Sequence, residues 1–296
     1  MTEYVYGILH GVDEKKRIIA IKGRTRVRFY YMAKGMFLNF MLYFNPGIFI
    51  FMDVQKNSRR YRGLTVQNVI NIEKILLPKA QHPKIYYDVS LIKSEIKTMI
   101  NSQKPRIFLD FEMSMPPFRN YQNFVSEIIQ VGLVLTDSSG TIIEKHSMFI
   151  KPVLHPEISD RTQKFLHIDQ SDIINGVEYP VFYRLFQKLI RSNQPMVFVW
   201  GQNDQIELKK MNSIHQLIDF TPRVQFIDLL KMHKTYFGLK NDLGLFNAYK
   251  AYASVDLNTQ MHDAFEDAMI TKKVFDSFLD ICNQNIDFVF PSENNE

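Results

Sequence analysis

The chain has 296 residues, of which 46% are apolar and 23% charged. This composition is typical of a soluble globular protein with a sizeable core, and it excludes a disordered chain. Its single cysteine, Cys282, excludes an intrachain disulfide and a cysteine-based zinc site, and fits a reducing, cytoplasmic location. The net charge of +5 hides an asymmetry. Residues 1–104 carry 18 Lys/Arg against 7 Asp/Glu, a net of +11, whereas residues 105–296 carry 18 against 24, a net of −6. Halves of opposite sign predict two domains with different tasks.

Short strand patterns separated by turn signals follow one another in the basic half. They cover residues 4–9, 17–22, 25–32, 36–44, 48–54 and 65–72, and a helix pattern follows at residues 88–102. The apolar window at residues 36–52 has the length of a membrane span, but Asn45-Pro46-Gly47 breaks it. We therefore interpret it as two strands joined by a turn and expect no membrane partner. The pattern predicts a small β-barrel of the OB or the Sm/SH3-like type and does not choose between them.

Basic and aromatic side chains gather in this half, which also holds 14 Phe/Tyr residues. Two groups of arginines stand out, one alternating along a predicted strand and one in a predicted loop at residues 56–62: Arg24, Arg26 and Arg28, and Arg59, Arg60 and Arg62. Because basic residues neutralise phosphates and aromatic rings stack on bases, the pattern predicts contact with single-stranded nucleic acid. The alternatives are a solvated basic face on a β-rich core and docking to another protein or RNA-bound machine.

The acidic half alternates strands and helices, which is typical of an α/β sheet with a mixed edge. Strands are predicted at residues 106–112, 127–135, 141–150, 196–200 and 224–227, and helices near 158–167 and 178–192, from 202, and over 262–282. In the first strand, Asp110 and Glu112 share one face. Two neighbouring carboxylates in an apolar strand would repel each other unless a divalent cation binds them. A solvent-exposed strand end is the alternative.

Two further segments add candidate ligands. Asp204 follows a buried strand at a predicted helix start, a position where aspartate is also favoured for helix reasons alone. Asp267 lies at the edge of the apolar stripe of the last helix. His262, at the start of that helix, is a candidate general base near neutral pH.

Taken in chain order, Asp110-Phe111-Glu112, then Asp204, then His262 followed by Asp267 resemble the signature of the DEDDh family of 3′–5′ exonucleases. That family includes ribonuclease T and the proofreading subunit of bacterial DNA polymerase III. The resemblance covers about residues 105–282, and the stretch 109–116 is similar to the KapD-like and ERI-type exoribonuclease branch in particular. Many relatives carry Thr and Gly soon after the glutamate, where residues 113–117 are Met-Ser-Met-Pro-Pro in this chain, which leaves the recognition of the 3′ end open.

The resemblance implies a ribonuclease H-like exonuclease fold, a mixed sheet flanked by helices, preceded by the small β-rich domain. The expected domains are residues 1–104, which would bind nucleic acid, residues 105–282, which would be the exonuclease, and a polar tail, residues 283–296. The resemblance further implies two divalent cations, Mg²⁺ or Mn²⁺, and no small-molecule cofactor. The implied metal ligands are Asp110, Glu112, Asp204 and Asp267, and His262 would take the proton from the attacking water.

The expected reaction is hydrolysis of single-stranded nucleic acid from its 3′ end to nucleoside 5′-monophosphates. The branch resemblance favours RNA as the substrate. The alternatives are a DNA 3′–5′ exonuclease of repair or proofreading, and a catalytically silent nucleic-acid-binding protein on an exonuclease fold. The sequence does not predict the oligomeric state.

Overall fold

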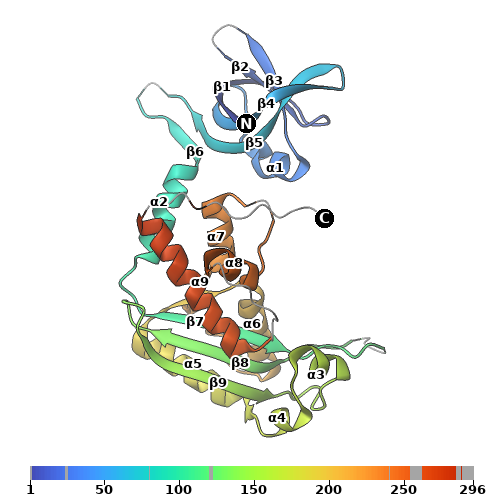
Figure 1. The fold of residues 1–296 in the computed structure, drawn as a ribbon, viewed down its shortest axis with the longest axis vertical. Coiled ribbons are helices and arrows are strands. Elements are labelled where there is room, and N and C mark those ends of the chain that lie inside the picture. Colours follow the sequence, from blue (N-terminus) through green and yellow to red (C-terminus); the bar gives the residue numbers. More distant parts are fainter. Residues whose placement is uncertain are drawn as a thin grey trace. The chain divides into compact units, whose positions relative to one another are not determined.

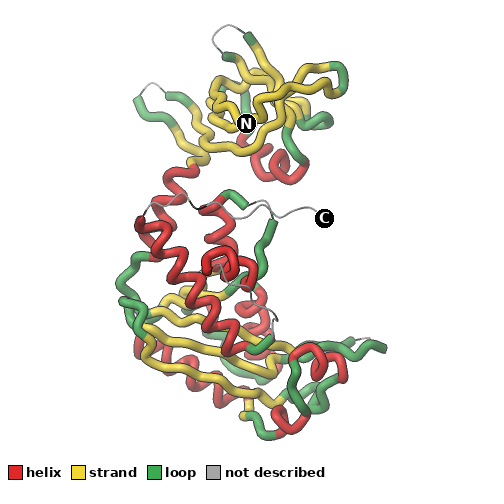
Figure 2. Tube along the Cα trace, viewed as in Figure 1, coloured by secondary structure: helices red, strands yellow, loops and turns green. Residues whose placement is uncertain are grey.

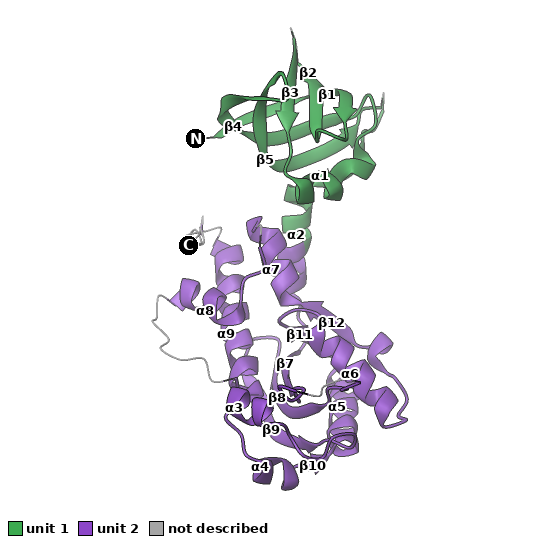
Figure 3. Cartoon of the chain, turned by 90° about the vertical axis from the view of Figure 1, so that its right-hand side faces the viewer, with its two compact units in different colours: residues 1–95 green, residues 96–296 purple. Residues whose placement is uncertain are grey.

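The computed structural model describes residues 2–23, 26–79, 81–119, 123–239, 241–253, 262–284 and 288. The chain divides into two compact units, an N-terminal unit, Met1–Glu95, and a C-terminal unit, Ile96–Glu296 (Figure 3). The boundary falls within helix α2 (Val89–Ile100). Of the helices that the structure describes, none combines the length and the apolar character needed to span a membrane.

The N-terminal unit is a barrel of antiparallel strands closed by one parallel pairing (Figures 1 and 2). Its strands are β1 (Thr2–Asp13), β2 (Ile18–Lys22), β3 (Val27–Tyr31), β4 (Phe49–Tyr61), β5 (Leu64–Leu77) and β6 (Lys84–Asp88). The sheet runs β3-β2-β1-β4-β5-β6, and β5 returns to pair in parallel with β3. Followed around the closed barrel, the strand order is therefore β1-β2-β3-β5-β4 and back to β1, and a helix lies between β3 and β4. This is the arrangement of an OB-fold barrel, one of the two types that the sequence left open.

The strand expected at residues 36–44 is wrong, because this segment forms helix α1 (Lys34–Phe40) and the 3-10 helix η1 (Met41–Tyr43). The segment contains no β-branched residue. Its less exposed side chains, Met36, Phe37, Phe40 and Met41, have helical spacing. Phe37 is buried against the barrel core and contacts Phe44. Leu38 and Leu42 point away and are 53% and 83% exposed.

The prediction of a loop at residues 56–62 is also wrong. Strand β4 continues to Tyr61, and its residues 58–61 pair with residues 64–67 of β5. A register shift between Val54 and Ser58 lets the long strand bend around the barrel. The turn to β5 consists of Arg62 and Gly63, which both have positive φ, 46° and 86°. Such two-residue turns match the twist of a hairpin, so strand pairing continues to the tip.

The C-terminal unit is built on a mixed six-stranded sheet flanked by helices, which confirms the fold expected for it. The strands are, in spatial order, β10 (Val177–Glu178), β9 (Ile142–Lys151), β8 (Ile128–Thr136), β7 (Arg106–Met113), β11 (Met196–Val199) and β12 (Gln225–Asp228). Strands β7, β8 and β9 are antiparallel neighbours, β11 and β12 continue the sheet in parallel with β7, and β10 is parallel to β9.

Helices cover both faces of this sheet (Figure 1). Helices α5 (Tyr179–Asn193) and α6 (Asn203–Ile214) pack with alternate residues of β7 and β8 in an apolar core. Helix α9 (Ala264–Gln284) covers the other face, where Phe275 contacts Phe108 and Phe198. The remaining helices are α3 (Asp160–Leu166), α4 (Gln170–Ile174), η2 (Thr221–Arg223), α7 (Leu229–Phe237) and α8 (Leu245–Ala253). Strands β6 and β10 and helices α4, α7 and α8 were not predicted from the sequence.

The start of α9 touches β8 backbone to backbone. A Cβ placed on Gly132 would clash with the main chain of Ala264 and Phe265, so only glycine allows this approach. Gly132 pairs with Asp110 in the neighbouring strand β7. The approach therefore sets where the first turn of α9 lies relative to the acidic residues of β7.

We expect Gly132→Ala to destabilise the protein by about 3 kcal/mol or more, because the added methyl group can be accommodated only by moving backbone. Thermal and urea unfolding of the full chain would measure this loss. The matched control is Gly244→Ala, whose Cβ would meet only the Asn247 side chain at an ordinary 3.9 Å. Equal stability of the two variants would contradict this account of the packing.

Candidate active site

Strand β7 carries two acids toward α9. Its side chains alternate between the two faces of the sheet. Leu109 and Phe111 lie in the core beneath α5 and α6, and Phe111 contacts Phe182 edge-on. Asp110 and Glu112 therefore lie on the face that α9 covers, and both are half-buried.

The first turn of α9 supplies a third acid, Asp267, and the residue before the helix fixes its position. Asp263 precedes the helix, and its carboxylate accepts hydrogen bonds from the backbone N–H groups of Phe265 and Glu266 at 3.0 and 2.9 Å, as an N-cap does. The Gln130 side chain of β8 donates to the same carboxylate at 2.6 Å. One turn later, Asp267 is buried beside the sheet. Capping and the bond to β8 thus hold Asp267 in place.

Asp204 comes from a third element. Because β11 runs parallel to β7, the carboxyl ends of these strands lie at the same edge of the sheet, and α6 begins there. Asp204 is buried in the first turn of α6, and its Oδ1 accepts a hydrogen bond from the backbone N–H of Phe111 at 3.1 Å. This bond attaches Asp204 to β7 between the two acids of that strand.

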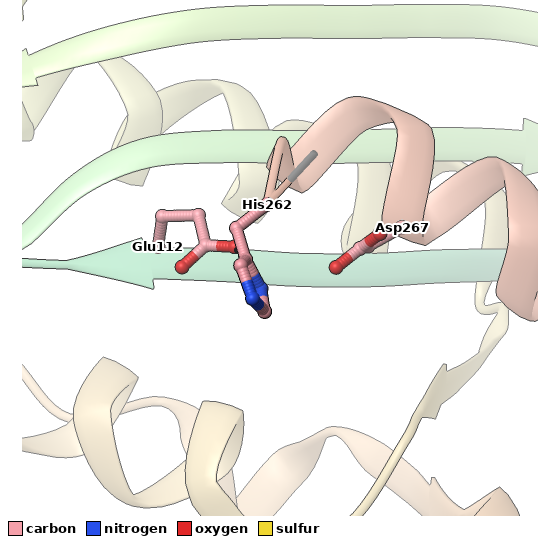
Figure 4. A group of neighbouring side chains, drawn as sticks. All are labelled: Glu112, His262 and Asp267. Atoms are coloured by element: carbon pink, nitrogen blue, oxygen red, sulfur yellow. Dashed lines mark ion pairs between the residues drawn. The ribbon is translucent and has the colours of Figure 1, made fainter. Parts of the chain in front are cut away.

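Glu112, His262 and Asp267 form the most compact group, with ligand atoms that all lie within 4.8 Å of one another (Figure 4). The Nδ1 atom of His262 is 4.0 Å from Oε1 of Glu112. The His262 ring also stacks on Phe165 of α3, with ring centroids 4.2 Å apart and planes inclined by 21°. Burial and the nearby His167 lower the pKa of His262, which keeps its imidazole neutral and able to accept a proton at neutral pH.

Four carboxylates of like charge lie together at the end of β7, Asp204 and Asp267 buried and Asp110 and Glu112 half-buried. Burial, with repulsion from neighbouring acids, raises the pKa of Glu112 to about 8 and the pKa values of Asp204 and Asp267 to about 7. Burial first, and then the charges of the other three acids, raise the pKa of Asp110 well above its usual range. Within the described part of the chain, no lysine or arginine forms an ion pair with any of these four acids.

A divalent cation fits this group of residues. The Oδ1 atom of Asp267 is buried and has no hydrogen-bond partner among the described residues, which is costly unless a ligand supplies one. Carboxylate oxygens are the hard ligands that Mg²⁺ and Mn²⁺ prefer. A bound cation would also offset the repulsion that raises the carboxylate pKa values.

The structure brings the five residues expected from the sequence to the carboxyl end of β7. Asp110 and Asp204 lie outside the most compact group but interact electrostatically with it. Sequence reasoning missed Asp263, Gln130 and Phe165. The spacing of Asp263 and Glu266 at the start of a helix pattern is a capping signal that could have revealed the first. Gln130 and Phe165 reach the site across about a hundred residues of chain, and no local pattern marks them.

The arginines expected to bind nucleic acid differ in their surroundings. Arg24 lies outside the described residues, and Arg26 is exposed just before β3. Arg28 is exposed, but it lies 3.7 Å from the carboxylate of Glu3, which offsets its charge. Arg60 is exposed in the distal part of β4.

Two of the predicted arginines belong to an arginine–tyrosine cluster at one end of the barrel, formed by Arg17, Tyr31, Arg59, Tyr61 and Arg62. The guanidinium carbon of Arg59 lies 4.8 Å from the ring centroid of Tyr31 and 5.0 Å from that of Tyr61. Arg17 donates a hydrogen bond to the Tyr31 hydroxyl at 2.9 Å, and Arg62 lies 5.6 Å from the Tyr61 ring. The cluster joins the turns β1–β2 and β4–β5 to strand β3. Arg17 and Tyr31 were not singled out from the sequence.

The region that carries the acidic site is similar to known proteins. A family model described as "Exonuclease" matches residues 107–275. The chain is 29% identical over 170 residues to a probable 3′-5′ exonuclease, KapD, of Bacillus subtilis (strain 168), an alignment that covers 57% of this chain and 82% of that protein.

Two solved structures share the fold of this region. The nuclease domain of 3′hExo, a DEDDh family member bound to rAMP, gives a TM-score of 0.51 at 14% identity and covers 64% of this chain and 97% of its own. A 3′-exonuclease that recognises the 3′ end of a histone mRNA stem-loop gives a TM-score of 0.51 at 14% identity, with coverages of 67% and 72%. At such identities the likeness concerns the fold alone.

The raised carboxylate pKa values predict how the stability of the metal-free protein depends on pH. Between the unfolded pKa values near 4 and the folded values of about 7 to 8, the folded state binds more protons than the unfolded state. The free energy of unfolding should therefore fall as the pH rises through this window. In EDTA we expect the Tm to drop by about 3 °C or more from pH 6 to pH 8, and Mg²⁺ or Mn²⁺ to restore it.

The variant Asp267→Asn should shrink this drop, because it removes one of the acids that resist ionisation. The exposed Asp280 of α9 offers the matched control Asp280→Asn, which should keep the drop of the wild type. A Tm in EDTA that is constant, or that rises, between pH 6 and pH 8 would show that the acids are not held as described.

Proposed function

The chain belongs to the exonuclease family whose model matches residues 107–275, and we propose that this 3′–5′ exonuclease acts on single-stranded nucleic acid, with RNA as its preferred substrate. The observation that carries the proposal is the group of four carboxylates at the carboxyl end of β7, two buried and two half-buried, beside a neutral histidine. Among the described residues, no lysine or arginine pairs with them. Such a group suits a metal-assisted hydrolysis of phosphodiesters better than it suits a structural role.

We assign the roles of the residues from this geometry together with the family resemblance. Asp110, Glu112, Asp204 and Asp267 would hold two divalent cations, Mg²⁺ or Mn²⁺. When bound, the cations lower the pKa of water and stabilise charge on the attacking and leaving oxygens. His262 accepts the proton of the attacking water, because its lowered pKa leaves the imidazole neutral. Nucleoside 5′-monophosphates leave from the 3′ end.

The proposal of RNA as the substrate is supported by the similarity of residues 109–116 to the KapD-like and ERI-type branch. It is also in line with the ligands named for the two solved structures, rAMP and a histone mRNA stem-loop. The alternative is a DNA exonuclease, and a comparison of hydrolysis of an RNA strand and a DNA strand of the same sequence distinguishes the two. A catalytically silent binding protein is disfavoured because none of the five residues of the DEDDh signature is replaced.

The N-terminal unit is proposed to capture the substrate. Residues 105–296 carry a net charge of −6, which repels a polyanion, whereas residues 1–104 carry +11. The arginine–tyrosine cluster offers guanidinium groups for phosphates and aromatic rings for bases. It lies at the two turns through which OB-folds commonly bind oligonucleotides. Docking to a protein or to an RNA-bound machine is the alternative partner for this surface.

The activity is tested with 5′-labelled RNA and DNA strands of one sequence, in Mg²⁺, Mn²⁺ or EDTA. We expect a metal-dependent ladder that shortens from the 3′ end, faster for RNA, and a loss of about 10²-fold or more in kcat for Asp110→Asn. Asp280→Asn is the control, because it makes the same substitution on the exposed side of α9.

Three outcomes of this assay would count against parts of the proposal. Faster shortening of DNA would identify the alternative substrate. Binding without shortening of either strand would indicate a catalytically silent nucleic-acid-binding protein instead. Shortening that persists unchanged in Asp110→Asn would contradict the assignment of the site.

The capture surface is tested through the salt dependence of binding. If Arg59 contacts a phosphate, Arg59→Gln in the full chain should weaken binding of a single strand and reduce the slope of log K against log salt by about 0.7. Lys79→Gln removes the same charge beyond the opposite end of β5 and should leave the slope unchanged. Identical slopes for both variants and the wild type would exclude the cluster as a phosphate contact.

A further inference from the structure

A cleft of about 610 Å³ opens in the C-terminal unit at the end of β7. This volume lies in the range of about 300–1,000 Å³ that is typical of small-molecule sites. One side is formed by residues 117–119 and Phe124, which follow β7 in the chain. The other side is formed by the loop from β9 to α3 and the first turn of α3, with His155 and residues 157–161.

Flat side chains line both sides of the cleft. Phe124 and His155 stack on each other, with centroids 4.6 Å apart and planes inclined by 15°. The guanidinium carbon of Arg161 lies 5.8 Å from the ring centroid of Phe118, which is 68% exposed. Aromatic faces and guanidinium planes are the groups on which unpaired bases stack.

Hydrogen bonds hold the two sides in place before any ligand arrives. The buried carboxylate of Glu127 accepts bonds from three consecutive backbone N–H groups, residues 153–155, at 2.8, 2.9 and 3.1 Å. The Ser159 hydroxyl donates to the carbonyl oxygen of Met115 at 2.9 Å, and the Met115 N–H donates to the Thr162 hydroxyl at the same distance. A preformed cleft loses little conformational entropy when it binds a ligand.

The cleft lies one helical turn from Phe165, the residue that stacks on the candidate general base. Arg161 and Phe165 are four residues apart on α3, so they are neighbours on the surface of that helix. Arg161 lines the cleft, and Phe165 stacks on His262. A strand whose 3′ end reaches His262 can therefore place one of its next nucleotides at the cleft.

The charges around the cleft are balanced. Arg119 and Arg161 can contact a phosphate, and the carboxylates of Glu157 and Asp160 can accept hydrogen bonds from base amino groups or ribose hydroxyls. A neutral, aromatic lining suits a base with its sugar better than it suits a bare phosphate chain.

We propose that this cleft binds a base of the substrate strand on the 5′ side of the terminal nucleotide. This inference rests on the proposed function, because it takes single-stranded nucleic acid as the ligand. The cleft then contributes affinity at one position of the strand, whatever the base, since every base has a face that stacks. It also requires that this position be unpaired.

The test uses the full chain with Asp110→Asn and Mg²⁺, so that binding is measured without hydrolysis. The probes are 5′-fluorescein RNA strands, each lacking the base at one position counted from the 3′ end, and the Kd comes from fluorescence anisotropy. In the Asp110→Asn chain, the parent of the variants below, we expect one position close to the 3′ end at which the missing base weakens binding about tenfold. Adding Phe118→Leu and Phe124→Leu should weaken binding of the intact strand and abolish the effect at that position.

Ile218→Ala is the control, because Ile218 is 81% exposed and lies beyond the end of α6 opposite Asp204. It should keep the position effect of the parent. Phe118→Leu alone, at an exposed side chain, gives a variant that folds if the double variant does not.

An effect that persists in the Leu variants, or the lack of any position effect in the parent, would overturn the proposal. Hydrolysis by the wild-type chain is measured separately on the intact strand. A position effect that is lost in the Leu variants, without hydrolysis by the wild type, would support the cleft and reject the proposed function.

Discussion

The close approach of two backbones at Gly132 and Ala264 is the constraint on which the acidic site depends. It brings the start of α9 onto β8 at the point where β8 pairs with Asp110. A larger residue at position 132 would lift the helix and separate Asp267 and His262 from the acids of β7. The site is therefore assembled by packing at a position that carries no functional group of its own.

The repulsion among the acids of the site, and their removal from water, destabilise the folded protein. Four acids share a region that water reaches poorly, and among the described contacts a clear offset is seen for Asp204, from the Phe111 N–H. The rest of the C-terminal unit supplies the stability, through an apolar core on the far side of β7 and the aromatic contacts of α9. Strain of this kind collects where proteins bind ligands. It also explains why a cation would serve both the stability and the chemistry of the site.

The sequence predicted the parts of the site that local patterns carry. Alternation placed Asp110 and Glu112 on one face of β7, and the helical stripe placed Asp267 beside the sheet. The turn signal at residues 45–47 led to a wrong strand at residues 36–44, where a segment without β-branched side chains forms α1 and η1. The arginine–tyrosine cluster and the cleft could not be predicted, because each joins segments that only the tertiary fold brings together. Arg17 lies in the β1–β2 turn and Tyr31 at the end of β3, and Phe124 meets His155 across about thirty residues of chain.

Glu127 shows how one side chain can organise a loop without constraining the sequence of that loop. Its carboxylate accepts hydrogen bonds from the main-chain N–H groups of residues 153–155, and these bonds do not depend on which side chains the three residues carry. Any residue other than proline can stand at these three positions and still donate its N–H. Relatives that keep a carboxylate before β8 are thus free to vary this rim of the cleft. Substrate preference could diverge there while the backbone that supports it stays the same.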